Sequence, residues 1–212
     1  MATRPGDEAE LQKREAIGVI RASRFVRKYA HSKDVIDTET IQKIHEVIFK
    51  DAWSEIAGQW RTENLKITDS SHLPPHHSEV AKHMNEVNVE FIKRLSGLKT
   101  LEGLFMENTE PTDEQMKLLD AVVETTAWIH HKITHVHPFR EGNGRTARLA
   151  ANLILERYGL VGISIKIERE NKNRYLDALK QIDKQWDYEP LKMLIYEGLA
   201  DRYSGLARNI IG

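Results

Sequence analysis

The chain contains no cysteine and no long apolar run among its 212 residues. Without cysteine it can form neither a disulfide nor a thiolate metal site, and this composition fits a reducing compartment. No run approaches the length of a membrane span, and the first residues, MATRPGDE, lack the apolar region of a secretory signal. We therefore expect a cytoplasmic protein with no membrane partner.

The chain also lacks a surplus of charge of either sign. Its 31 basic and 32 acidic residues leave a net charge of −1, whereas broad nucleic-acid binding usually needs a basic surplus. We therefore expect no nucleic-acid partner. What is present is an apolar content of 40%, which is enough for a core, in a length typical of one domain.

Helical periodicity dominates the sequence, so we expect a mainly α fold. Apolar residues recur at helical spacing, and Thr112 followed by Gln115 has the pattern of a capping box at a helix start. The stretch 96–111 contains glycine, asparagine and proline and is expected to be a loop. The expected helices span residues 8–29, 38–52, 78–95, 112–134, 144–158, 169–184 and 189–203.

Residues 137–148, HPFREGNGRTAR, combine a histidine, a carboxylate, a glycine-rich turn and two arginines. The two glycines permit a tight turn, and the helix that follows begins with unpaired N–H groups that can bind an anion. Arg145 and Arg148 share one helix face and can reach the same ligand. A capped chain reversal or a solvated helix face would explain single residues but not the whole set. The set indicates a site for a nucleoside triphosphate.

Clustered histidines raise the alternative of a zinc enzyme. His131 and His135 have the i, i+4 spacing of a helical metal pair, and other histidines could add ligands: His72, His76, His77, His130 and His137. The sequence has no cysteine and no His-Glu-x-x-His pattern, which makes a structural or protease-type zinc site the weaker interpretation. Polar helix faces or buried hydrogen-bonded histidines explain the cluster more simply.

The stretch 137–148 resembles the motif of the Fic family, His-x-Phe-x-Asp/Glu-Gly-Asn-Gly-Arg-x-x-Arg, at every fixed position. Other segments are similar to the family as well: GQWR at 58–61, LKIT at 65–68, the Pro74-Pro75 pair, His131, Tyr175 with Leu179, and Pro190-Leu191. The resemblance implies a Fic-type helical bundle with a short β-hairpin flap over the active site. We expect an N-terminal helical arm at 1–37, a Fic domain at 38–200 and a C-terminal tail at 201–212.

Fic proteins mostly transfer AMP from ATP to a hydroxyl side chain of a target protein, and the resemblance implies the same activity here. His137 would be the general base, Glu141 would hold Mg²⁺ between the α- and β-phosphates, and Tyr175 is a candidate for contacting adenine. The remaining motif positions would bind phosphate: Gly142, Asn143 and Gly144 through the turn, and Arg145 and Arg148 through their guanidinium groups.

The alternation of polar and apolar residues at 64–68 predicts a short strand followed by a turn. In the family, a hairpin here covers the nucleotide and pairs with an extended segment of the target by strand addition. We therefore expect Leu65, Lys66, Ile67 and Thr68 to contact nucleotide or target. A surface hairpin without a role is the alternative.

Regulation departs from the family pattern. Many Fic proteins carry an inhibitory helix with the pattern Ser/Thr-x-x-x-Glu-Gly/Asn, whose glutamate pairs with the second motif arginine. Glu197 precedes Gly198 at the C-terminal location, but Met193 stands where Ser or Thr belongs. Glu197 is therefore either inhibitory or an ordinary helix charge. In the second case a separate antitoxin-like protein would inhibit the activity, or nothing would inhibit it.

Two other classes of function stay open. One is a Fic-fold transferase of another phosphate-containing group, such as a kinase-like, UMP or phosphocholine transferase. The phosphorylating Doc branch often lacks the second motif glycine, and the presence of Gly144 favours AMP transfer. The other is a non-catalytic regulator with the same fold, which the intact set of His137, Glu141, Arg145 and Arg148 disfavours.

Overall fold

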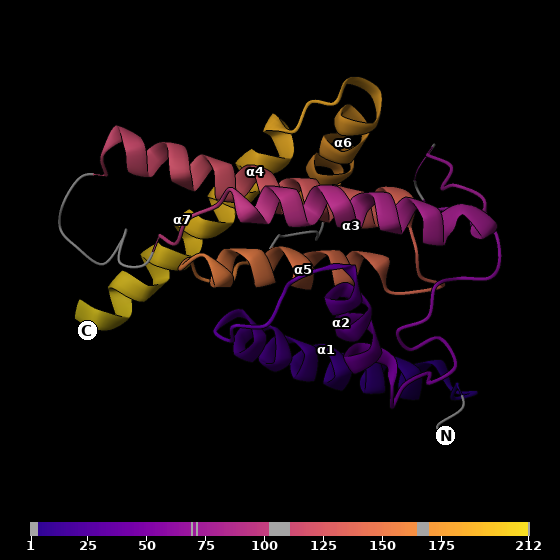
Figure 1. Cartoon of the computed structure of the whole chain (residues 1–212). Helices are drawn as coiled ribbons and strands as arrows, with labels where there is room; N and C mark the ends of the chain where they lie inside the picture. Colours follow the sequence, from indigo (N-terminus) through magenta and orange to yellow (C-terminus); the bar gives the residue numbers. More distant parts are fainter. Residues whose placement is uncertain (1–3, 69, 71, 102–110, 165–169, 212) are drawn as a thin grey trace.

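A computed structural model of the chain describes residues 4–68, 70, 72–101, 111–164 and 170–211 (Figure 1). Within these residues every regular element is helical, which confirms the mainly α class. Each expected helix is present. In chain order the elements are α1 (Glu8–Ala30), α2 (Thr38–Phe49), the short 3-10 helix η1 (His77–Glu79), α3 (Val80–Ser96), α4 (Asp113–Val136), α5 (Asn143–Arg157), α6 (Glu170–Gln185) and α7 (Glu189–Ile211).

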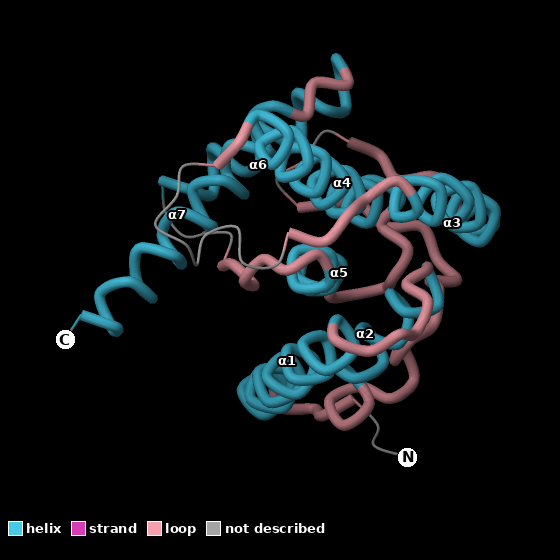
Figure 2. The backbone as a smooth tube through the Cα atoms, turned by 60° about the vertical axis from the view of Figure 1, so that its left-hand side comes forward, coloured by secondary structure: helices cyan, strands magenta, loops and turns pink. Residues whose placement is uncertain are grey.

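Helix α5 lies in the middle of the bundle. It packs against α4, α1 and α2, and Figure 2, which looks along α5, shows the other helices arranged around it. Its buried face includes the small residues Ala147, Ala150 and Ala151, which let neighbouring helices approach closely, and the larger Leu153 and Ile154. Because the motif arginines lie on the first two turns of this helix, the packed core fixes where they stand.

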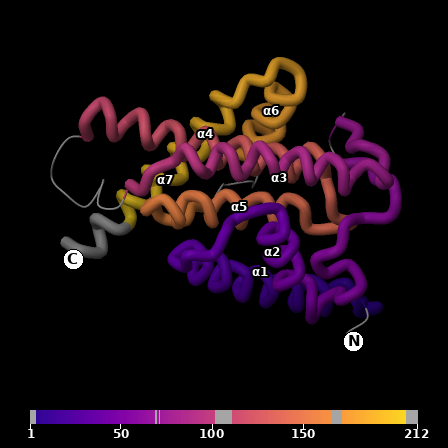
Figure 3. Tube along the Cα trace, viewed as in Figure 1, coloured from indigo at the N-terminus to yellow at the C-terminus, as the bar shows by residue number. Residues whose placement is uncertain are grey.

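Helix α1 runs beside α2 and below α5 (Figure 3), and its buried residues belong to the same core. Helices α1 and α2 approach closely at Gly18, where an added Cβ would lie 2.8 Å from the carbonyl carbon of Ile48. Only glycine allows this contact. The structure therefore packs the expected helical arm onto the core, while the domain boundaries at 37 and 200 stay predictions, since α7 continues through residue 200.

Side-chain caps fix the helix starts. The expected capping box before α4 is confirmed: Thr112 accepts the N–H of Gln115 and Gln115 accepts the N–H of Thr112. Asp37 and Thr40 form the same reciprocal pair before α2. Each such cap typically stabilises a helix by about 1 kcal/mol, because it satisfies donors that the helix leaves unpaired.

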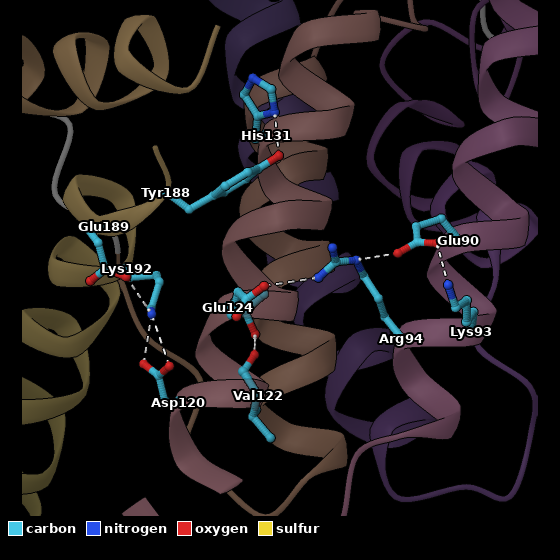
Figure 4. Close-up of polar contacts among 11 residues, drawn as sticks. Glu90, Lys93, Arg94, Asp120, Val122, Glu124, His131, Tyr188, Glu189 and Lys192 are labelled. Carbon is cyan, nitrogen blue, oxygen red and sulfur yellow. Dashed lines mark hydrogen bonds and ion pairs between the residues drawn. The ribbon is translucent and has the colours of Figure 1, made fainter. Parts of the chain in front are cut away.

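Helix α7 is tied to α4 by a buried lysine. The ammonium of Lys192 lies 2.9 Å from Asp120 and 2.8 Å from Glu189, and the hydroxyl of Tyr196 donates to Asp120 at 2.8 Å (Figure 4 shows Lys192 with both carboxylates). These contacts hold the pKa of the Asp120 carboxyl below its usual value even though burial opposes the shift. The C-terminal helix is thereby anchored to the first half of α4.

The β-hairpin flap is not confirmed, since residues 61–68 and the described residues up to 77 form no paired strand. Side chains satisfy the backbone groups here in place of a strand ladder. The buried Arg61 donates from Nη1 to the carbonyl of Glu63 and from Nη2 to that of Pro75, and the side-chain oxygen of Asn64 accepts the N–H of His77. Residues 61–77 are called the flap segment below.

No helix in the described part of the chain is both long and apolar enough to span a bilayer.

Candidate active site

His137 ends α4 in a left-handed conformation, with φ 52° and ψ 56°. Such a conformation is uncommon for a residue other than glycine and reverses the chain at this point. The Nδ1 atom of His137 lies 3.3 Å from the carbonyl oxygen of Thr134, so a proton on Nδ1 leaves Nε2 free to accept another. Burial lowers the pKa of His137, which favours the neutral form that can act as a base.

The loop after His137 is closed by Asn143. The side-chain oxygen of Asn143 accepts the N–H of Phe139 at 2.9 Å, and its amide donates to the carbonyl of Phe139 at 2.7 Å. The fully buried Phe139 stacks on His45 of α2, with ring centroids 3.8 Å apart. His45 also reaches the carbonyl of Glu141 at 3.0 Å through Nε2. Contacts with buried side chains therefore hold the loop from inside the protein.

Gly142 is required at its position. Its φ of +75° lies in the left-handed region, and an added Cβ would come within 2.7 Å of the Cζ atom of Phe49. This conformation turns the chain into α5 and leaves the N–H groups of Asn143, Gly144 and Arg145 without a hydrogen-bond acceptor among the described residues. These three donors stand at the positive end of the helix dipole, where an anion binds best.

The two motif arginines have different surroundings. Arg145 is held between two carboxylates: it pairs with Glu15 of α1 and lies 3.0 Å from Glu141. Arg148 is half-buried, and within the described residues it has no ion-pair partner. Burial lowers the pKa of Arg148 without discharging the guanidinium. Arg148 is therefore a half-buried cation with no counter-ion among the described residues.

All of the predicted phosphate and flap residues line one cavity of about 390 Å³. Its walls are Leu65, Lys66, Ile67, Thr68, His137, Arg140, Glu141, Gly142, Asn143, Gly144, Arg145 and Arg148. The structure thus brings the flap segment and the start of α5 together. The individual roles of these residues stay predictions.

A second cavity of about 160 Å³ adjoins the first, because Ile67, His137 and Gly144 line both. Its other walls include Tyr175, Leu176 and Leu179 of α6, so it is mainly apolar. The buried Tyr175 lies 3.4 Å from His130 through its hydroxyl. The contact of Tyr175 with an adenine base stays a prediction.

Glu197 does not lie against Arg148. Its two oxygens pair with Arg174 of α6, at 2.7 and 3.1 Å, near the surface. Among the described residues, no other carboxylate takes its place at Arg148. An inhibitory contact of Glu197 with Arg148 is therefore absent from this structure, which agrees with the alternative of an ordinary helix charge.

Sequence reasoning missed two residues that shape the site, His45 and Glu15, and gave a third, Arg61 of the GQWR segment, no role of its own. His45 supports the motif loop, Glu15 neutralises Arg145, and Arg61 joins the flap segment to the motif: its Nε donates to the carbonyl of His137, and its N–H to that of Pro138. The position of His45 among the apolar residues of the expected helix 38–52 was a weak indication that its ring is buried and supports another segment. Nothing in the sequence indicated Glu15 as a partner of Arg145.

Proteins similar to this chain include several that are named protein adenylyltransferase. Protein adenylyltransferase Fic of Nematostella vectensis is 28% identical over 172 residues, which cover 81% of this chain and 34% of that protein. Protein adenylyltransferase fic-1 of Caenorhabditis elegans is 29% identical over 156 residues, covering 73% and 26%. The match therefore spans between about a quarter and a third of the length of these relatives.

Solved structures agree on the fold. Fic-1 from Caenorhabditis elegans matches with a TM-score of 0.69 and 25% identity, covering 97% of this chain and 54% of that one. The BepC protein of Bartonella tribocorum, solved with bound AMPPNP, matches with a TM-score of 0.64 and 15% identity, covering 92% and 88%. The model of the Fic/DOC family matches residues 35–155, more than half of the chain. The motif histidine, carboxylate and arginines lie around one cavity. The chain that contains them belongs to the Fic/DOC family.

Proposed function

We propose that this chain transfers AMP from ATP to a hydroxyl side chain of a target protein. The observation that carries the proposal is the 390 Å³ cavity, in which a base, a carboxylate, two arginines and three unpaired backbone donors face one another. Relatives named protein adenylyltransferase support it, as do family structures that contain AMPPNP or ADP.

The two adjoining cavities suit the two ends of ATP. The polar cavity would take the phosphates, with the N–H groups of α5 and the guanidinium groups around them. The apolar cavity beside Tyr175 would take the flat base. Because Ile67, His137 and Gly144 line both cavities, the junction between them is the place for the ribose and the α-phosphate.

The chemistry follows from where His137 stands. Its Nε2 would take the proton from the target hydroxyl as that oxygen forms a bond to the α-phosphorus. The bond from the α-phosphorus to the bridging oxygen breaks, and pyrophosphate leaves with that electron pair. Arg145 and Arg148 would hold the negative charge that moves onto the leaving group. The proton stays on His137 until solvent or product removes it.

Glu141 is suited to holding Mg²⁺. One of its oxygens accepts from Gly142 and Arg145, and the other has no hydrogen-bond partner among the described residues. A single carboxylate that shares the ion with phosphate oxygens is a common arrangement for Mg²⁺. When bound, the ion would neutralise charge on those oxygens. Glu141 is half-exposed, so it can turn from Arg145 toward the phosphates.

The target would dock on residues 65–68. Leu65 and Ile67 are half-buried toward the cavity, while Lys66 and Thr68 are exposed. Apart from a bond between the Ile67 carbonyl and Ser70, the backbone groups here have no partner among the described residues. They are free to pair with an extended target segment, which would bring its hydroxyl to His137. A separate antitoxin-like inhibitor would have to bring a carboxylate to Arg148.

Labelled ATP tests the proposal directly. The purified chain is incubated with a lysate and with ATP labelled at either the α- or the γ-phosphate, and protein-bound label is measured for wild type and for His137→Ala. AMP transfer leaves only the α-label on protein and releases pyrophosphate. Retention of the γ-label would instead establish phosphoryl transfer, and absence of both labels would favour a non-catalytic role.

A further inference from the structure

A second group of polar side chains lies in the wall of the smaller cavity. His72 comes from the flap segment, His135 from the last turn of α4 and Asp183 from α6. The proposed transfer reaction uses none of them. They come from three separate elements, far apart in the sequence, and still converge on one point.

The donor atoms of these residues are close enough to share an ion. One ligand atom from each of His72, His135 and Asp183 lies within 4.8 Å of the other two. Two imidazole nitrogens and one carboxylate oxygen form a donor set that suits divalent transition metals, Zn²⁺ in particular, and suits Mg²⁺ poorly. All three residues are half-buried, so they are shielded from bulk water yet reachable through the cavity.

Surrounding hydrogen bonds orient each donor. The Nε2 atom of His72 lies 2.8 Å from the carbonyl oxygen of His135, so a proton there leaves Nδ1 as the free donor. The Nδ1 atom of His135 lies 2.7 Å from Asp183, so this nitrogen and the carboxylate face one another, and an ion could take the place of the proton between them. A metal-bound histidine is usually held by a carbonyl or carboxylate on its second ring nitrogen, as His72 is by the carbonyl of His135.

His131 acts as a fixed support for Asp183. Its Nε2 atom lies 2.9 Å from the same carboxylate oxygen that His135 contacts, and its ring is buried. The hydroxyl of Tyr188 lies 3.3 Å from the other nitrogen of His131, as Figure 4 shows. Both nitrogens of His131 are therefore engaged. The second oxygen of Asp183 has no partner among the described residues.

A plain hydrogen-bond network explains only part of this arrangement. It accounts for His131, Asp183 and the Nδ1 atom of His135, but it leaves Nδ1 of His72 and Nε2 of His135 without partners among the described residues. The rings of His72 and His135 stack on each other with centroids 4.1 Å apart, in a cavity that Ile67 and Leu179 also line. A cation shared by the three residues would give Nδ1 of His72 a partner beside Asp183 and His135.

We propose that His72, His135 and Asp183 bind one divalent transition-metal ion, with Zn²⁺ the best match. Three protein ligands leave a fourth position, which faces the cavity, open to water or to a ligand. The ion would link the flap segment to α4 and α6. This site is separate from Glu141, whose carboxylate lies in the other cavity.

Metal binding is measured on the chain without nucleotide. The protein is freed of metal with a chelator and titrated with Zn²⁺ by calorimetry in excess Mg²⁺, and Co²⁺ serves as a spectroscopic probe of a tetrahedral site. Wild type is compared with His72→Ala and Asp183→Asn. His76→Ala is the matched control, because His76 belongs to the same segment but stacks on His77 away from the cluster.

We expect one Zn²⁺ per chain that excess Mg²⁺ does not displace. Loss of an outer-shell partner typically weakens metal binding about 10- to 100-fold, so each ligand variant should lose more than that, and His76→Ala should bind as wild type does. Zn²⁺ should also raise the melting temperature of wild type and not of Asp183→Asn. Equal binding by all variants, or no Zn²⁺ bound by the wild type, would overturn the proposal. Because no nucleotide is present, neither result bears on AMP transfer.

Discussion

Glu15 of α1 and Arg145 of α5 form an ion pair at the edge of the larger cavity, and the glutamate is largely buried. Arg145 also contacts Glu141, so a guanidinium expected to hold phosphate is already shared by two carboxylates. A carboxylate and a phosphate compete for the same N–H donors. ATP bound in the proposed way would therefore displace at least part of this arrangement.

We expect Glu15→Gln to tighten ATP binding. Although Glu15 is largely buried, Arg145 is partly exposed, so we expect the pair to be worth ~1 kcal/mol and its loss to strengthen ATP binding about fivefold. Calorimetric titration with ATP gives the affinity, and Glu10→Gln, which breaks an exposed pair with Arg14 on the same helix, is the control. Weaker binding by Glu15→Gln would mean that Glu15 holds Arg145 in its productive position.

His137→Ala should abolish transfer and leave ATP binding within a few-fold of wild type. His137 is the motif residue able to accept a proton near neutral pH, and its role is expected in the reaction rather than in ground-state affinity. Labelling and calorimetry on the same preparation separate the two effects. Transfer at the wild-type rate would remove His137 from the mechanism.

The pH dependence of transfer should show an acid limb set by His137. Burial lowers the pKa of His137 below its ordinary value of 6.5, so the imidazole is neutral and active at neutral pH. The rate should stay level there and fall only below 6.5, as the base becomes protonated. Single-turnover rates measured alongside ATP affinity at each pH separate this from titration of the nucleotide. A midpoint above 6.5 would contradict the burial argument.

Arg148→Ala should weaken ATP more than AMP. The half-buried Arg148 has no anionic partner among the described residues, and a hydrogen bond to a charged group is worth about 1.5–3 kcal/mol, which corresponds to a loss of about 10- to 100-fold for ATP. Arg174→Ala, which removes an exposed guanidinium paired with Glu197, should change neither affinity. Equal losses for ATP and AMP would show that Arg148 only supports the helix.

Gly142→Ala should destabilise the loop that leads into α5. The left-handed backbone costs an alanine about 1 kcal/mol, and the contact with the ring of Phe49 adds about 1–3 kcal/mol of overpacking. Thermal melting measures the loss. Adding Phe49→Leu should recover the overpacking part and not the backbone part. A Gly142→Ala variant that melts with wild type would show that the ring moves away freely.

Local features of the sequence predicted much of the fold and the contents of the site. Helical periodicity and the Thr112–Gln115 pair predicted the helices because these signals act within one or two turns. Residues 137–148 are contiguous in the chain, so the sequence alone indicated that the histidine, carboxylate and arginines form one site. Residues 65–68 were assigned to the same site only because the segment resembles a family.

Other features depend on contacts between distant segments. Arg145 meets Glu15, and Phe139 meets His45, only after α1 and α2 have packed on α5, and no short-range pattern records such pairs. The hairpin prediction was not confirmed for a related reason. The alternation at 64–68 correctly indicated two faces, but Arg61 and Asn64 satisfy neighbouring backbone groups in place of a second strand.

The central position of α5 makes the proposed catalysis and the folding of the chain depend on the same helix. The donors at its start stand on a helix whose other residues, Leu153 and Ile154 among them, are the middle of the core. A cavity made there by mutation would let the helix shift, and a shift along its axis would move the N–H groups relative to the phosphates. Core substitutions far from the cavity would thus change the rate of the proposed reaction. Selection for that rate would therefore limit which core substitutions accumulate during evolution.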